Sequence, residues 1–125
     1  MEKLLREPTP YSPYVDFREN GILIMKGRAF PENALEFFGP LILFTEELEV
    51  ERIVLDLDLE YFNTASAKKL LDLMKAADGN SKVNNVIINW RFEEGDDDSV
   101  ETAEIFEESL SRAKFNYIEY CEVVP

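Results

Sequence analysis

The chain of 125 residues contains no histidine and only one cysteine. Without histidine it cannot carry a Ser-His-Asp or Cys-His catalytic arrangement, or a metal site with imidazole ligands. The single cysteine, Cys121, excludes a disulfide within the chain, and its setting in YIEYCEVV predicts a packed strand residue rather than a reactive thiol. These absences remove several common enzyme classes, and we expect no cofactor.

Basic residues are scarce, with 13 Lys and Arg against 26 Asp and Glu and a net charge of −13. Nucleic acids and anionic membranes bind basic surfaces, so neither is an expected partner. Proteins with basic surfaces are favoured instead. The chain has no apolar run of transmembrane length, and residues 1–6 lack the apolar core of a signal peptide, so we expect a cytoplasmic protein.

The length predicts a single domain over residues 1–125 with one hydrophobic core. Residues 1–13 include Pro8, Pro10 and Pro13, which predict an extended N-terminal arm. Residues 14–18 and 22–26 alternate in polarity around the turn sequence Glu-Asn-Gly, which predicts an antiparallel hairpin.

Helices and strands alternate along the chain after the hairpin. Asn33 and Glu36 predict a helix start, and Pro40 should kink or split that helix. The strands at residues 53–60 and 86–92 alternate in polarity, and their polar positions are Asp56, Asp58, Asn89 and Arg91. If the strands are neighbours, these side chains form ion pairs on a partly open face. We therefore predict an α/β fold with a mixed four- to five-stranded sheet and helices mainly on one face.

The acidic segment EEGDDD at residues 93–98 precedes a helix that Ser99 should cap and that should run to about Ala113. A last strand is predicted at residues 115–123. Clustered carboxylates suit Mg²⁺ or Ca²⁺, but consecutive aspartates do not match an EF-hand. The plainer interpretation is a solvated loop.

The segment DLDLEYFNTASAKKLLD at residues 56–72 joins a strand to a helix. Asn63 can cap this helix with Ser66 three residues later, or Thr64 can be the cap. Either arrangement places Thr64 at a helix N-terminus, facing water. A hydroxyl there can be an ordinary cap, or it can accept a phosphoryl group that the positive helix end stabilises.

An enzyme hypothesis rests on Asp56 and Asp58. They imitate the Asp-x-Asp of haloacid-dehalogenase-like phosphatases, in which the first carboxylate attacks phosphorus. Glu60 stands where that motif has threonine, the two aspartates lie within the strand, and the chain is short for that fold.

The segments GRAFPENALEFFGPL, DLEYFNTASAKKLLDLM and VIINWRFEEGDDDSVETAEIFEE resemble the SiaC family of bacterial regulatory phosphoproteins, from Thr9 to about Tyr120. The resemblance implies a single STAS-like domain that acts by binding rather than catalysis. The chain departs from the family pattern at Ala65, where serine is more usual, and at Arg91, where an aromatic residue is common.

The resemblance also implies a partner switch. A cognate kinase phosphorylates Thr64, a PP2C-type phosphatase reverses the reaction, and one form binds a target, in the best-known systems a diguanylate cyclase that raises cyclic di-GMP and promotes biofilm. An anti-sigma-factor antagonist of the STAS type is the alternative. Asn63 and Ser66 are expected to shape the helix start, and Lys68 is expected to pair with the phosphate. Tyr61 and Phe62 are expected to form an apolar contact beside it.

Overall fold

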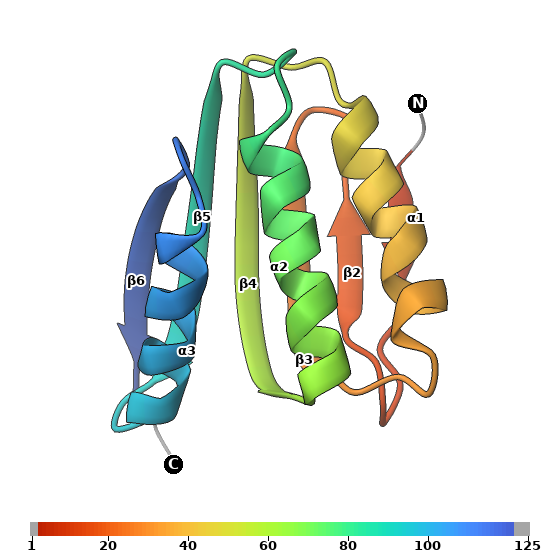
Figure 1. Ribbon diagram of the computed structural model, residues 1–125. Coiled ribbons are helices and arrows are strands. Elements are labelled where there is room, and N and C mark those ends of the chain that lie inside the picture. The colour runs from red at the N-terminus through yellow and green to blue at the C-terminus, as the bar shows by residue number, and fades with distance from the viewer. Residues whose placement is uncertain (1–2, 122–125) are drawn as a thin grey trace.

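The computed structural model describes residues 3–121 as one mixed sheet of six strands with three helices (Figure 1). The strands are β1 (Leu4–Arg6), β2 (Tyr14–Phe17), β3 (Ile22–Ala29), β4 (Arg52–Phe62), β5 (Asn85–Glu93) and β6 (Lys114–Tyr120), and the helices are α1 (Ala34–Glu47), α2 (Thr64–Asp78) and α3 (Asp97–Glu108). The predicted α/β class is confirmed, but the sheet has more strands than the four to five predicted. The additional strand is β1, a short edge strand within the N-terminal arm.

The strands lie in the sheet in the order in which they occur in the chain. β1, β2 and β3 pair antiparallel, whereas β3, β4, β5 and β6 are parallel. Connections between parallel strands are almost always right-handed, so a sheet that grows in one direction places every connecting helix on the same face. Figure 1 shows α1, α2 and α3 on one face, as predicted, and the other face uncovered.

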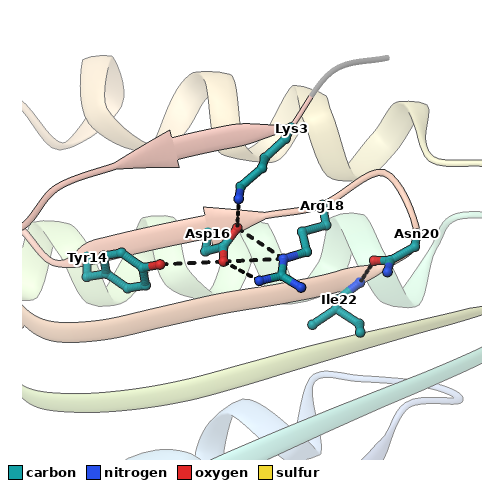
Figure 2. A network of polar contacts seen from close by, with 6 residues as sticks. All are labelled: Lys3, Tyr14, Asp16, Arg18, Asn20 and Ile22. Atoms are coloured by element: carbon teal, nitrogen blue, oxygen red, sulfur yellow. Dashed lines mark hydrogen bonds and ion pairs between the residues drawn. The ribbon is translucent and has the colours of Figure 1, made fainter.

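The β2–β3 hairpin turns at Gly21, as the Asn-Gly signal predicts. Gly21 has a φ of 95°, and a Cβ atom there would lie 2.2 Å from the carbonyl oxygen of Arg52, so only glycine fits. The side chain of Asn20 closes the turn by accepting a hydrogen bond from the amide of Ile22 at 3.1 Å (Figure 2). This turn fixes the register between β2 and β3.

Asp16 lies on the uncovered face of β2, where Lys3, Tyr14 and Arg18 converge on its carboxylate (Figure 2). Arg18 Nη2 lies 3.0 Å from one carboxylate oxygen, and Lys3 Nζ lies 3.7 Å from the other. The hydrogen bond from Arg18 lowers the pKa of Asp16 despite its burial. The network ties the start of the chain to the hairpin.

The core fills the space between the sheet and the helices. Alternation along β4 buries Ile53, Leu55, Leu57 and Leu59. α1 is one continuous helix, so it is not split at Pro40. Pro40 has no amide hydrogen, so the carbonyl of Glu36 lacks its hydrogen bond within the helix. Both residues are exposed, and water can satisfy that carbonyl.

α3 begins two residues before the predicted cap Ser99 and ends at Glu108, five residues before Ala113. Asp96 is the N-cap, and its side chain accepts a hydrogen bond from the Ser99 amide at 3.1 Å. The Ser99 hydroxyl instead accepts a hydrogen bond from Trp90 Nε1 at 2.9 Å. The predicted cap residue therefore anchors the helix start to β5.

The segment after α3 leaves the helical path because Asp78, at the end of α2, holds it. The Asp78 carboxylate accepts hydrogen bonds of 2.8 to 2.9 Å from the backbone amides of Ser111, Arg112 and Ala113. Burial raises the pKa of Asp78, but these three bonds outweigh it, so the pKa is lowered overall.

β6 ends at Tyr120, and Cys121 is exposed, so the prediction of a packed strand cysteine is wrong. A hydrogen bond to Glu94 raises the pKa of the thiol. The predicted end of the strand at Val123 lies outside the described residues.

Candidate functional site

Thr64 is the first residue of α2 and follows the carboxyl end of β4 after one intervening residue. Asn63 is the N-cap, because its side chain accepts a hydrogen bond from the Ser66 amide at 2.9 Å. Thr64 is therefore not the cap. Its side chain is exposed, and within the described part of the chain its hydroxyl makes no hydrogen bond. The hydroxyl is open to a modifying enzyme.

The first turn of α2 contains no acidic residue, whereas those of α1 and α3 contain Glu36 and the pair Asp97 and Asp98. A helix N-terminus carries about half a positive charge, which nearby carboxylates neutralise. At α2 this charge is left for another anion. Lys68, one turn further along, is exposed and makes no ion pair with any residue between 3 and 121.

Ser66 does not reach the surface. Its side chain is 0% exposed, and its hydroxyl has no hydrogen-bond partner among the described residues. Its contribution to the helix start comes through its backbone amide, which Asn63 caps. A kinase or partner protein can therefore reach Thr64 but not Ser66 without opening the helix.

Tyr61 and Phe62 point to opposite sides of β4. The ring of Phe62 packs at centroid distances of 5.9 Å from Trp90 and 6.5 Å from Phe106, within the helix-covered core. Tyr61 is 52% exposed and packs edge-to-face against Phe30 at 5.3 Å. Tyr61 thus contributes an exposed apolar surface at the carboxyl end of β4, three residues before Thr64, whereas Phe62 packs in the core.

Two aromatic residues that the sequence does not single out complete this surface. Phe30, in the loop before α1, packs between Tyr61 and Tyr11, and the Tyr11 and Phe30 centroids are 5.5 Å apart. The Phe30 amide donates to the Tyr11 carbonyl at 2.8 Å. The N-terminal arm, which carries Tyr11, folds back to this position, and no local pattern in the sequence reveals that return.

Asp56, Asp58 and Arg91 lie on the uncovered face of the sheet, as predicted. Arg91 holds Asp56 with two hydrogen bonds, Nε to Oδ1 at 2.7 Å and Nη2 to Oδ2 at 3.0 Å, so the predicted ion pair is confirmed. The pair raises the pKa of Arg91. A phosphatase nucleophile needs a free carboxylate, and this one is engaged by a guanidinium within the strand. The geometry does not favour the enzyme hypothesis.

The acidic segment 93–98 forms the end of β5, a turn and the start of α3. Asp96 is occupied as a helix cap. Among residues 3–121, no three His, Cys, Asp or Glu side chains are placed to hold a metal ion. Over the same residues, no helix is both long enough and apolar enough to cross a membrane.

Similar proteins share both sequence and fold with this chain. An uncharacterized protein of Pseudomonas aeruginosa strain UCBPP-PA14 is 33% identical over 98 residues, which cover 73% of this chain and 75% of that protein. The crystal structure of apo-SiaC from P. aeruginosa superposes with a TM-score of 0.77 at 30% identity, covering 94% of this chain and 99% of that one.

A second solved structure contains a partner. A chain of the crystal structure of the diguanylate cyclase SiaD in complex with its activator SiaC, also from P. aeruginosa, matches with a TM-score of 0.81 at 28% identity, over 94% of this chain and 99% of that one. Residues 6–120 match the family described as SiaC family regulatory phosphoprotein. The chain therefore belongs to the SiaC family of regulatory phosphoproteins.

Proposed function

We propose that this protein is a cytoplasmic activator of a diguanylate cyclase whose binding is switched by phosphorylation of Thr64. The observation that carries the proposal is an exposed, unbonded threonine hydroxyl on an uncompensated helix N-terminus. The related SiaC is the activator of the cyclase SiaD in a solved complex, which supports a cyclase as the target class.

The switch has a physical basis in charge and bulk. A phosphoryl group adds about −1.5 to −2 charges and three acceptor oxygens. At the start of α2, backbone amides and the helix end stabilise this group in the free protein, with Lys68 one turn away. In an interface shaped for neutral Thr64, the same group has to be desolvated and accommodated. The unmodified form is therefore the one that binds the cyclase.

The remaining parts of the switch are two enzymes that act on Thr64. A cognate protein kinase adds the phosphoryl group, and a PP2C-type phosphatase removes it. Both need access to an exposed hydroxyl, which Thr64 provides and the buried Ser66 does not. Cyclic di-GMP synthesis then follows the fraction of unmodified protein.

The proposal is tested by measuring the affinity of two variants for purified SiaD, the cyclase of the related complex. Thr64→Ala should bind within about twofold of the wild type, whereas Thr64→Glu should bind at least about tenfold more weakly. Ser81→Glu is the matched control, because it adds the same charge at an exposed position beyond the other end of α2. Equal binding by both Thr64 variants, or an equal loss in Ser81→Glu, would contradict the switch.

A further inference from the structure

We propose that Tyr11, Phe30 and Tyr61 form a docking platform for the cyclase, which inserts an apolar side chain flanked by basic residues. This inference rests on the proposed function and identifies the surface that does the binding. Tyr11 is 60% exposed and Tyr61 is 52% exposed, and both pack on the partly buried Phe30. Aromatic side chains of this kind are enriched among the residues that dominate binding energy.

The platform is preorganised, because contacts between three segments of the chain hold its rings in place. Both of its ring pairs meet edge-to-face, with interplanar angles of 88° and 78°. The Asn63 amide donates to the carbonyl of Ala29 at 3.3 Å, and the Phe30 amide donates to the carbonyl of Tyr11. These bonds tie the arm, the loop before α1 and the end of β4 together, so binding orders few additional groups.

A hollow of about 340 Å³ opens beside the platform, lined by Arg28, Phe30, Glu60 and Tyr61. Two aromatic rings form its apolar walls. Arg28 and Glu60 form an ion pair at its rim, with Nε and Oε2 3.4 Å apart, so the rim offers no unpaired charge to a ligand. A large apolar side chain fits such a hollow better than a charged group does.

The charge around the platform indicates which cyclase residues lie on either side of the apolar side chain. Glu7 and Glu32 are exposed and lie in the same two segments as Tyr11 and Phe30. The one cation of the hollow, Arg28, already pairs with Glu60. A second copy of this chain, with its net charge of −13, would bring carboxylates against carboxylates. The occupant is therefore a segment of the cyclase with an apolar centre and Lys or Arg on either side.

The position of the platform also accounts for the sign of the switch. Thr64 follows Tyr61 by three residues, at the same carboxyl edge of the sheet. A phosphate on Thr64 would add charge at the edge of the sheet that carries the platform, and the guanidinium at the platform is already paired. The basic residues of the cyclase segment face the carboxylates of Glu7 and Glu32, so the phosphate has to be desolvated against the apolar anchor, which costs binding energy.

The test is the affinity for purified SiaD, measured at two salt concentrations. Tyr61→Ala should weaken binding at least about tenfold and Tyr11→Ala by a smaller factor, whereas Tyr61→Phe should stay within about twofold because the ring is kept. Leu43→Ala is the control, since Leu43 is a 59% exposed apolar residue on α1, away from the hollow. Wild-type affinity should fall as salt rises, because basic flanks contribute.

Each outcome separates the platform from the switch. If wild type binds and Thr64→Glu does not, but Tyr61→Ala and Tyr11→Ala bind normally, the platform is wrong and the switch stands. If Leu43→Ala loses as much as Tyr61→Ala, the surface is misplaced. If wild type binds neither SiaD nor a diguanylate cyclase of its own host, the proposed function fails, and the platform fails with it. Thermal unfolding of each variant identifies any loss due to misfolding, and Tyr11→Ala then carries the test.

Discussion

Helices α2 and α3 are built on the same plan but differ at their N-termini. Each follows a parallel strand, and each is capped by a side chain that accepts a hydrogen bond from the third helical amide, at 2.9 Å in α2 and 3.1 Å in α3. α3 adds Asp96, Asp97 and Asp98 to this end. α2 has Asn63 as its cap, Thr64 after it and no carboxylate in its first turn.

The difference shows that capping and charge compensation are separate features of a helix start. The cap satisfies one backbone amide in both helices, whereas the positive end is neutralised by fixed carboxylates only in α3. α3 has a permanent form of the negative charge that α2 would receive from phosphorylation. The negative charge at the start of α3 is therefore permanent, whereas the first turn of α2 carries none.

The two helices also differ in how firmly they pack. α2 buries Leu70, Leu73, Met74 and Ala77 in addition to Ser66, whereas α3 buries only Ala103 and Phe106. The helix that carries Thr64 is thus the one with the larger share of the core. A phosphate at its start would act on a well-packed helix rather than on a loosely held segment.

The largest expected effect tests this difference in packing. Leu73→Ala should lower the free energy of unfolding by about 2–5 kcal/mol, because Leu73 is fully buried in α2. Ile105→Ala on α3 should stay within about 0.5 kcal/mol, since that side chain is 62% exposed. Urea denaturation of both variants measures the contrast, and a larger loss in Ile105→Ala would show that α3 packs against more than its exposed surface indicates.

A smaller effect tests the difference in charge. Thr64→Asp gives α2 the first residue that α3 has, and it should raise the free energy of unfolding by about 0.3–1 kcal/mol at low salt. Asp97→Thr makes the reverse change in α3. It should lower the free energy of unfolding by less than Thr64→Asp raises it, because Asp98 remains in the first turn of α3. High salt should reduce both changes. Destabilisation by Thr64→Asp, measured by the same denaturation, would contradict an uncompensated helix end at α2.

Local patterns in the sequence were enough to predict much of the fold. Alternation identified β4 and β5, the Asn-Gly pair identified the hairpin, and the polar residues on neighbouring strands correctly predicted the pair of Asp56 and Arg91. Of the two caps predicted for α2, Asn63 with Ser66 is the one that forms, and Thr64 is not the cap. These features depend on residues close in sequence or on one strand pairing.

The features that sequence reasoning missed depend on contacts between distant segments. Ser99 is a good cap by type, but Trp90 engages its hydroxyl, and Asp96 takes the position. β1 is a strand because it pairs with β2. Its three residues precede a proline-rich stretch and show no strand pattern of their own. Phe30 and Tyr11 meet Tyr61 only in the folded chain. Pro40 does not split α1, and the carbonyl that loses its partner belongs to the exposed Glu36.

Mass spectrometry of the protein from its native host can show whether Thr64 is phosphorylated, as we propose. Trypsin releases residues 53–68, which contain both Thr64 and Ser66. With phosphatases inhibited during lysis, we expect phosphate on Thr64 in at least one growth state and none on the buried Ser66. Phosphate on neither residue in any growth state, or on Ser66 alone, would contradict this proposal.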